Sequence, residues 1–133
     1  MHLVKYICIK FILKARYFIF ISFKGARYHG WQLQPNSLSI QKILDDTLSL
    51  VLKEKISTTG AGRTDSGVNA SVFCAHFDSM VPDLDLKENL IFRLNRFLPA
   101  DIAVGAIKRT APDAHARVSA LSRTYKYFIS RQK

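Results

Sequence analysis

The chain has 133 residues, of which 48% are apolar, and this length and composition describe one globular domain with its own core and exclude a disordered chain. The 20 Lys and Arg residues against 10 Asp and Glu give a net charge of +10, so the candidate partners are RNA, DNA or an anionic membrane surface, against the alternative of a basic surface without a partner. The 2 cysteines, Cys8 and Cys74, are far apart without Cys-x-x-Cys spacing, which excludes a disulfide framework and favours a reducing, cytoplasmic setting.

The first 15 residues, MHLVKYICIKFILKA, are apolar but are interrupted by Lys5, Lys10 and Lys14. The longest uncharged run is well short of the ~20 residues that a membrane-spanning helix needs, and no small-residue cleavage site follows. We therefore interpret residues 1–15 as an N-terminal extension of unassigned role and expect no membrane partner; an interfacial helix is the alternative.

The next segments alternate between strand and helix patterns. Residues 16–23, RYFIFISF, are rich in aromatic and β-branched residues and predict a buried strand that ends at Lys24 and Gly25. A helix is then predicted, with Ser37 or Ser39 as its N-cap, by apolar residues at helical spacing: Ile40, Ile43, Leu44, Leu48, Val51 and Leu52.

Residues 56–59 and 72–77 are short strand candidates on either side of a glycine-rich loop. Leu86, Leu90, Ile91, Leu94 and Phe97 predict a second helix, which Pro99 ends, and residues 102–108 predict another strand. The order β-α-β-β-α-β is the split β-α-β, or ferredoxin-like, pattern of an α+β fold, with two helices on one face of an antiparallel sheet.

A last strand is expected over residues 124–130, where Tyr125, Tyr127 and Ile129 alternate with Lys126 and Phe128. No turn or cap signal follows this strand. Either the chain stops on a sheet edge, or it is the first part of a longer protein.

The loop over residues 60–70, GAGRTDSGVNA, surrounds Arg63, Thr64 and Asp65 with three glycines. It is not a phosphate-binding loop, because no Lys-Ser/Thr pair follows its second glycine and Asp65 stands where a dinucleotide loop needs glycine. In an extended segment Arg63 and Asp65 point to the same side, so the guanidinium can keep the carboxylate ionised, as a nucleophile must be. The alternative is an Asx turn over residues 64–67 with a structural Arg–Asp pair.

This loop closely resembles the signature of the tRNA pseudouridine synthase A (TruA) family, whose G-R-T-D-x-G-V-x-A core holds the catalytic aspartate. Further segments match in order: YHGWQLQ over residues 28–34, NRFLPADIAV over residues 95–104 and AHARVSALSRTYKY over residues 114–127. The resemblance implies that residues 16–133 are the N-terminal catalytic domain of such an enzyme, with the related C-terminal half absent.

By this resemblance, Asp65 is the nucleophile that attacks a uridine in the anticodon stem-loop of tRNA, at C6 of the uracil or C1′ of the ribose. Arg63, Thr64 and Arg117 would bind the RNA, and Tyr125 would stack on the uracil. The family's isomerisation uses no metal and no other cofactor, and its members form homodimers that bind tRNA. This chain, without the second half, is expected to have little activity.

Three positions depart from the family pattern: Asn69, Ser66 and Lys24 stand where His, Ala and Asp are usual. Since none replaces the nucleophile, we expect altered hydrogen bonding in the loop rather than loss of chemistry. Two further positions are interpreted as core, Tyr28 and Trp31, because an aromatic beside glycine turns more often covers a core than stacks on RNA.

His115 is interpreted as a structural hydrogen-bonding residue. Lys108, Arg109, Arg123 and Lys126 are expected on a basic surface that faces RNA. Two other functions are considered. One is a non-catalytic RNA-binding module of the same fold, and the other is phosphate-ester chemistry, for which the sequence lacks a phosphate-binding loop.

Overall fold

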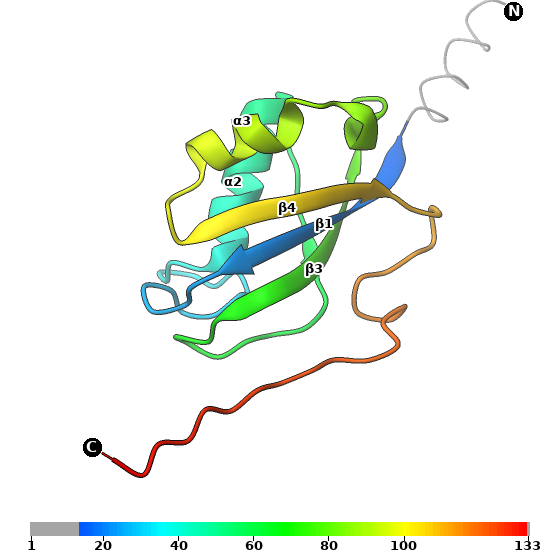
Figure 1. Ribbon diagram of the computed structural model, residues 1–133. Coiled ribbons are helices and arrows are strands. Elements are labelled where there is room, and N and C mark those ends of the chain that lie inside the picture. The colour runs from blue at the N-terminus through cyan, green and yellow to red at the C-terminus, as the bar shows by residue number, and fades with distance from the viewer. Residues whose placement is uncertain (1–13, 133) are drawn as a thin grey trace, which may run out of the picture.

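The computed structural model describes residues 14–132, which form a 4-stranded antiparallel sheet in the order β2-β3-β1-β4 with two helices (Figure 1). In chain order the elements are β1 (Ala15–Phe23), α2 (Ile40–Leu52), β2 (Thr59–Gly60), β3 (Ala70–Ser79), the 3-10 turn η1 (Leu84–Leu86), α3 (Leu90–Phe97) and β4 (Ile102–Arg109). This order confirms the predicted α+β, ferredoxin-like fold. Of the predicted extension over residues 1–15, residues 1–13 lie outside the described residues, and Ala15 already begins β1.

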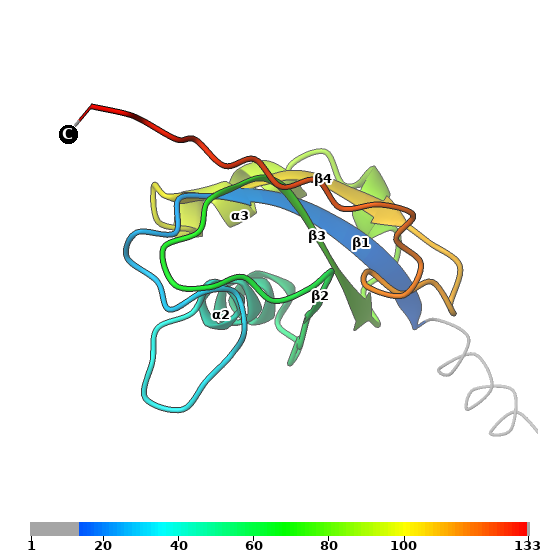
Figure 2. The ribbon, with the colours of Figure 1, turned by 90° about the horizontal axis from the view of Figure 1, so that it is seen from below.

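The centre of the sheet is β1, which pairs with β3 on one side and β4 on the other. Its alternate residues Tyr17, Ile19, Ile21 and Phe23 are buried, as a strand with one covered face requires. These side chains share one hydrophobic cluster with leucines of both helices: Leu44, Leu48, Leu90 and Leu94. Both helices therefore cover the same face of the sheet, and Figure 2 shows the chain after β4 on the side away from α2.

Helix α2 begins directly after Ser39, one of the two serines predicted as its N-cap. The Oγ of Ser39 accepts a hydrogen bond from the backbone N–H of Lys42 at 3.2 Å, so Ser39 rather than Ser37 is the N-cap. The helix ends at Lys53, whose φ of 53° is left-handed. No helix within residues 14–132 is long and apolar enough to cross a membrane.

The second helix is shorter than its apolar pattern predicts. It begins at Leu90, because the backbone turns at Asp83, where φ is 55°, and residues 84–86 form only a 3-10 turn. Leu84 is buried at this turn, whereas Leu86 is 72% exposed. Leu86 fits the helical spacing of the apolar residues, but it lies outside the helix.

Strand β2 lies later than the predicted residues 56–59. Side chains of α2 occupy the backbone groups of Thr58: the carboxylate of Asp45 accepts its N–H at 3.1 Å, and Nε2 of Gln41 donates to its carbonyl oxygen at 2.7 Å. The backbone before Thr59 is thus bonded to the helix, and only Thr59 and Gly60 pair with β3.

The strand predicted over residues 124–130 is not formed. No strand within residues 14–132 pairs with this segment, which runs clear of the sheet in Figure 1. Tyr125 is 64% exposed, and Phe128 and Ile129 are more than 90% exposed. The alternating pattern indicated an extended backbone correctly, but a strand also needs a neighbouring edge.

Candidate active site

The glycine loop, residues 60–70, connects β2 to β3 and contains a tight turn. The N–H of Val68 donates to the carbonyl oxygen of Asp65 at 3.2 Å, and Gly67, the third residue of this turn, has a φ of 82°. Asp65 is therefore the first residue of the turn, and its side chain is exposed.

A second loop, the backing loop over residues 25–31, supports the glycine loop through three hydrogen bonds. The N–H of Gly25 donates to Oδ1 of Asn69 at 2.8 Å. The carbonyl oxygen of Tyr28 accepts the N–H of Gly67 at 3.3 Å, and Oγ1 of Thr64 accepts the N–H of Trp31 at 3.1 Å. These bonds fix the glycine loop on both sides of Asp65.

The two loops approach too closely for side chains at two glycines. A Cβ on Gly30 would overlap the carbonyl oxygen of Thr64, and a Cβ on Gly25 would overlap that of Val68. Gly30 also has a φ of 77°, which L side chains rarely adopt. The glycines of the backing loop thus set its distance from Asp65.

The backing loop is itself anchored to the core. The hydroxyl of Tyr28 donates to Oδ1 of Asp101 at 2.6 Å, and burial together with this bond raises the pKa of Tyr28 to about 12. The indole of Trp31 is fully buried against Phe73, with ring centroids 4.6 Å apart. Tyr28 and Trp31 are core residues, as predicted.

The expected contact between Arg63 and Asp65 is absent. Within residues 14–132, the ion pairs are Arg16–Asp78, Arg27–Asp101 and Lys42–Asp46, and no hydrogen bond ends on the carboxylate of Asp65. Two exposed charges gain only about 0–1 kcal/mol by pairing in water, so nothing in the free protein holds them together.

The Asx turn is not formed either, since the turn at Asp65 is closed by its backbone carbonyl. Both Arg63 and Asp65 are exposed. The loop therefore presents a carboxylate without a protein partner, which is available to a ligand.

A further segment, residues 114–123, crosses from the sheet to the start of the glycine loop; we call it the strap. Arg123 donates from Nε and Nη2 to the carbonyl oxygen of Ala61 at 3.1 and 2.9 Å, and from Nη2 to that of Arg117 at 2.7 Å. The predicted residue Arg117 is therefore brought beside the loop through its backbone, with its side chain exposed. Tyr125 lies two residues beyond Arg123 and is not in a described contact with the loop.

His115 has the structural role predicted for it. Its Nδ1 accepts the N–H of Arg117 at 3.1 Å and that of Val118 at 3.3 Å, which closes a turn of the strap.

The sequence interpretation missed the positioning roles of Asn69 and Arg123. Both sit in segments that had been noted, but their partners, Gly25 and Ala61, are far away in the chain. Gly25, before YHGW, and Gly30, within it, were the available signal for a close approach of two loops.

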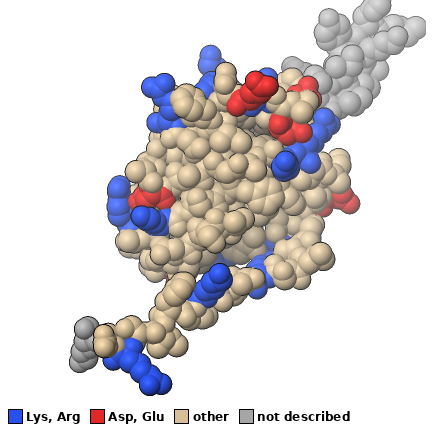
Figure 3. All heavy atoms as spheres, viewed as in Figure 1, with Lys and Arg blue, Asp and Glu red and all other residues tan. Residues whose placement is uncertain are grey.

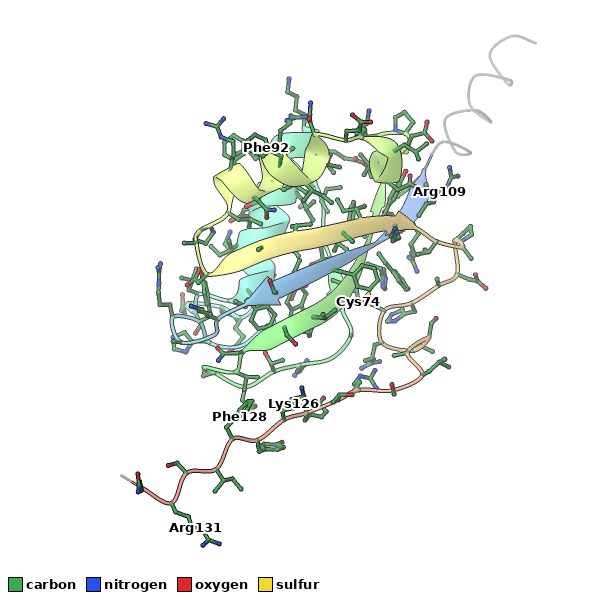
Figure 4. The ribbon with its side chains drawn as sticks, in the orientation of Figure 1. Cys74, Phe92, Arg109, Lys126, Phe128 and Arg131 are labelled. Carbon is green, nitrogen blue, oxygen red and sulfur yellow. The ribbon has the colours of Figure 1, made fainter. Side chains whose placement is uncertain are left out.

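Basic side chains are exposed on the loops and the C-terminal segment around the site: Lys24, Arg27, Arg63, Arg117, Arg123, Lys126 and Arg131. Lys126, Phe128 and Arg131 project from the segment after the strap, outside the sheet (Figure 4). In Figure 3 blue side chains follow this segment, and red ones gather mainly near the opposite end of the molecule. Within residues 14–132, no group of three or more His, Cys, Asp or Glu side chains could hold a metal ion.

Comparison with known proteins gives the relatives of this chain. No family model matches it. Over 118 residues, 89% of its length, it is 49% identical to the tRNA pseudouridine synthase A of Bacteroides fragilis and covers 46% of that protein. The chain is similar to the N-terminal domain of tRNA pseudouridine synthase A. This finding confirms the resemblance that the glycine loop indicated.

Other proteins of the same name agree. The chain is 47% identical over 118 residues to tRNA pseudouridine synthase A of Bacteroides thetaiotaomicron, and 42% identical over 114 residues to that of Colwellia psychrerythraea. These two matches include 89% and 86% of this chain, but only 43% of each relative. The chain thus spans less than half the length of the tRNA pseudouridine synthases A that it matches.

Proposed function

We propose that residues 16–133 are the N-terminal catalytic domain of a tRNA pseudouridine synthase, which converts uridine to pseudouridine in the anticodon stem-loop of tRNA. One observation carries this proposal. Asp65 is exposed and has no side-chain partner among residues 14–132, on a turn that the backing loop fixes on both sides, in a chain 49% identical to a tRNA pseudouridine synthase A.

In the proposed reaction, the ionised carboxylate of Asp65 attacks C6 of the uracil or C1′ of the ribose. The C1′–N1 bond breaks, the base rotates, and a C5–C1′ bond forms. The hydrogen on C5 is lost, N1 gains one, and Asp65 is released. The product is an isomer of the substrate, so the overall reaction consumes no second reactant.

The target base must first leave its stack, which costs a few kcal/mol and has to be offset by contacts with the protein. We assign stacking on the flipped base to Tyr125, whose ring is 64% exposed, and phosphate contacts to Arg63 and Arg117. Thr64 has a double role in this proposal. Its Oγ1 accepts the N–H of Trp31, and its hydroxyl hydrogen can still be donated to RNA.

The proposal extends to the whole protein. Since the matched relatives are more than twice as long as the matched segment, we infer that a full cleft around Asp65 needs a second wall, and that residues 14–132 alone have little activity. We further propose a cytoplasmic protein that acts as a homodimer, with residues 1–15 as an N-terminal extension.

The test replaces Asp65 by Asn in the protein expressed from its full natural reading frame. Pseudouridine formation in tRNA should fall by about 10⁴-fold or more, the scale seen when a nucleophile is removed. The Kd for tRNA should change less than about 2-fold, because Asn keeps the size and polarity of the side chain. Asp85→Asn, which changes an exposed acid on η1, is the matched control and should leave both quantities unchanged.

Two results would contradict the proposal. Undiminished product from the Asp65→Asn protein would exclude the nucleophile. Tight tRNA binding by the wild-type protein with no product at all would favour the alternative, a non-catalytic RNA-binding module of the same fold.

A further inference from the structure

We propose that His76 and Arg123 are positioning residues, which dock the two ends of the strap to β3 and to the glycine loop and so limit where Arg117 and Tyr125 can lie when RNA reaches Asp65. His76 lies on β3 and Arg123 in the strap itself. The sequence placed Arg123 on the basic surface that faces RNA, but its guanidinium donates to two backbone carbonyl oxygens of the protein. That this docking serves catalysis rests on the proposed function; the docking itself follows from the contacts below.

The first end of the strap is bound to His76. Its side chain is only 5% exposed, and its Nδ1 accepts the N–H of Ala116 at 3.0 Å. Ala116 is 4% exposed, and the ring of His115 packs edge-on against His76 with centroids 4.5 Å apart. An imidazole nitrogen can accept only when it is unprotonated, so this contact requires neutral His76 with its proton on Nε2.

A neighbouring ion pair reinforces the same end. Arg16 of β1 donates from Nε and Nη2 to the carboxylate of Asp78 at 2.8 and 3.1 Å, which holds its guanidinium in place. Its Nη1 donates to the carbonyl oxygen of Ala114 at 2.9 Å. Two successive turns of the strap backbone are therefore bonded to side chains of the sheet.

The second end of the strap is bound by Arg123 to Ala61, the second residue of the glycine loop. The N–H of Ala61 donates to the carbonyl oxygen of Cys74 on β3 at 2.8 Å, so the residue that Arg123 binds is itself bonded to the sheet. Arg123 also closes the strap on itself through the carbonyl oxygen of Arg117. Losing this side chain would free the chain after residue 117 from the loop.

Between its two ends the strap is exposed and has no helix or strand, so its position depends on these contacts. Arg117 lies between the ends and Tyr125 directly follows the second. A free strap would leave both side chains intact, but in the bound complex it would hold them in the reactive arrangement only part of the time. The expected consequence is a lower kcat rather than a lost affinity.

Low pH should release the first end of the strap from His76. Burial and then the positive charge of Arg16 lower the pKa of His76, while Asp78 acts in the opposite direction. Because docking lowers the pKa of His76, the docked state is favoured at high pH. It is lost as the pH falls below the ordinary pKa of histidine. The docked strap should therefore be stable at pH 7.5 and weaken toward pH 5.

Amide hydrogen exchange of Ala116 in the 133-residue chain tests the docking directly. In the wild-type chain the protection factor should fall about 10-fold between pH 7.5 and pH 5, the scale of losing one hydrogen bond. In His76→Asn, whose Oδ1 replaces Nδ1 as acceptor and does not titrate, protection should be kept and become independent of pH. In His76→Leu it should be low at both pH values.

Circular dichroism and the fluorescence of Trp31 would show whether His76→Leu still folds; if it does not, the pH profile of His76→Asn decides alone. A protection factor of Ala116 that falls equally in wild type and His76→Asn would overturn the role of His76.

Kinetics of the protein from its full natural reading frame test the role in catalysis. Arg123→Gln should lower kcat for pseudouridine formation about 10-fold or more with the Kd for tRNA within about 3-fold, and Arg123→Lys, which can still donate to Ala61, should recover part of the loss. Arg93→Gln, which removes an exposed positive charge on α3, is the matched control for charge, and it should leave kcat unchanged.

Equal losses in Arg123→Gln and Arg93→Gln, or a loss confined to tRNA affinity, would overturn the positioning role while leaving the proposed function intact. Product that persists in Asp65→Asn would instead overturn the proposed function, and the role of the strap in catalysis with it.

Discussion

Gly30 shows how a single residue controls the candidate site. Its backbone lies against Thr64, one residue before Asp65, and its φ of 77° together with this approach leaves no room for a Cβ. The separation of the two loops, and hence the position of the carboxylate, depends on the absence of this one carbon.

Gly30→Ala should therefore destabilise the fold by about 2 kcal/mol or more, from backbone strain and from the overlap with Thr64. Gly67→Ala is the matched control: Gly67 has a similar φ of 82°, but a Cβ there meets nothing within 4 Å. It should lose only about 1 kcal/mol. Urea unfolding followed by Trp31 fluorescence measures both, and equal losses would show that the contact between the loops is unimportant.

At the scale of elements, α2 positions β2 as well as covering the sheet. Asp45 of α2 accepts both the N–H and the hydroxyl of Thr58, at 3.1 and 2.6 Å, just before β2 and the glycine loop. Burial raises the pKa of Asp45 to about 6 despite these bonds. The helix thus holds the start of the loop with a carboxylate that is partly desolvated.

The raised pKa of Asp45 predicts how the stability of the fold changes with pH. An acid whose pKa is raised in the folded state binds protons more readily there, so folding gains stability as the pH falls through about 6. Asp45→Asn keeps an acceptor for Thr58 and removes the charge. Its stability relative to wild type should be higher at pH 7.5, by about 1–2 kcal/mol, and the difference should shrink toward pH 4.5. A difference that is constant with pH would contradict this account.

The helices and strands could be predicted from sequence where local pattern decides them. The strand β1 and the start of α2 are encoded locally, and both were predicted, with Ser39 as one of two candidate caps. The bounds of β2 and α3 were missed because side chains of α2 and a left-handed Asp83 set them. The strand over residues 124–130 failed because pairing depends on a neighbour that no local pattern encodes.

The same division applies to the site. The exposed turn that carries Asp65 could be predicted from three glycines and a family resemblance. Its supports could not, because Asn69 bonds to Gly25 and Arg123 to Ala61 across long stretches of chain. The predicted Arg63–Asp65 pair was wrong, since water competes for both exposed groups.

At the scale of the whole molecule, the net charge of +10 and the exposed basic side chains around the site predict that tRNA binding weakens with salt. With about 4 phosphate contacts, log K should fall with log salt at a slope of about −4. Arg63→Gln should reduce this slope by about 1, whereas Lys87→Gln, at the end of η1, should leave it unchanged. Affinity that is indifferent to salt would contradict a phosphate-dominated interface.

The central claim is that the carboxylate of Asp65 attacks uridine. Its most direct test is mass-spectrometric mapping of pseudouridine in tRNA treated with the protein from its full natural reading frame, as wild type and as Asp65→Asn. The account predicts pseudouridine in the anticodon stem-loop with the wild-type protein and none with Asp65→Asn. Pseudouridine at the same positions with both proteins would contradict it.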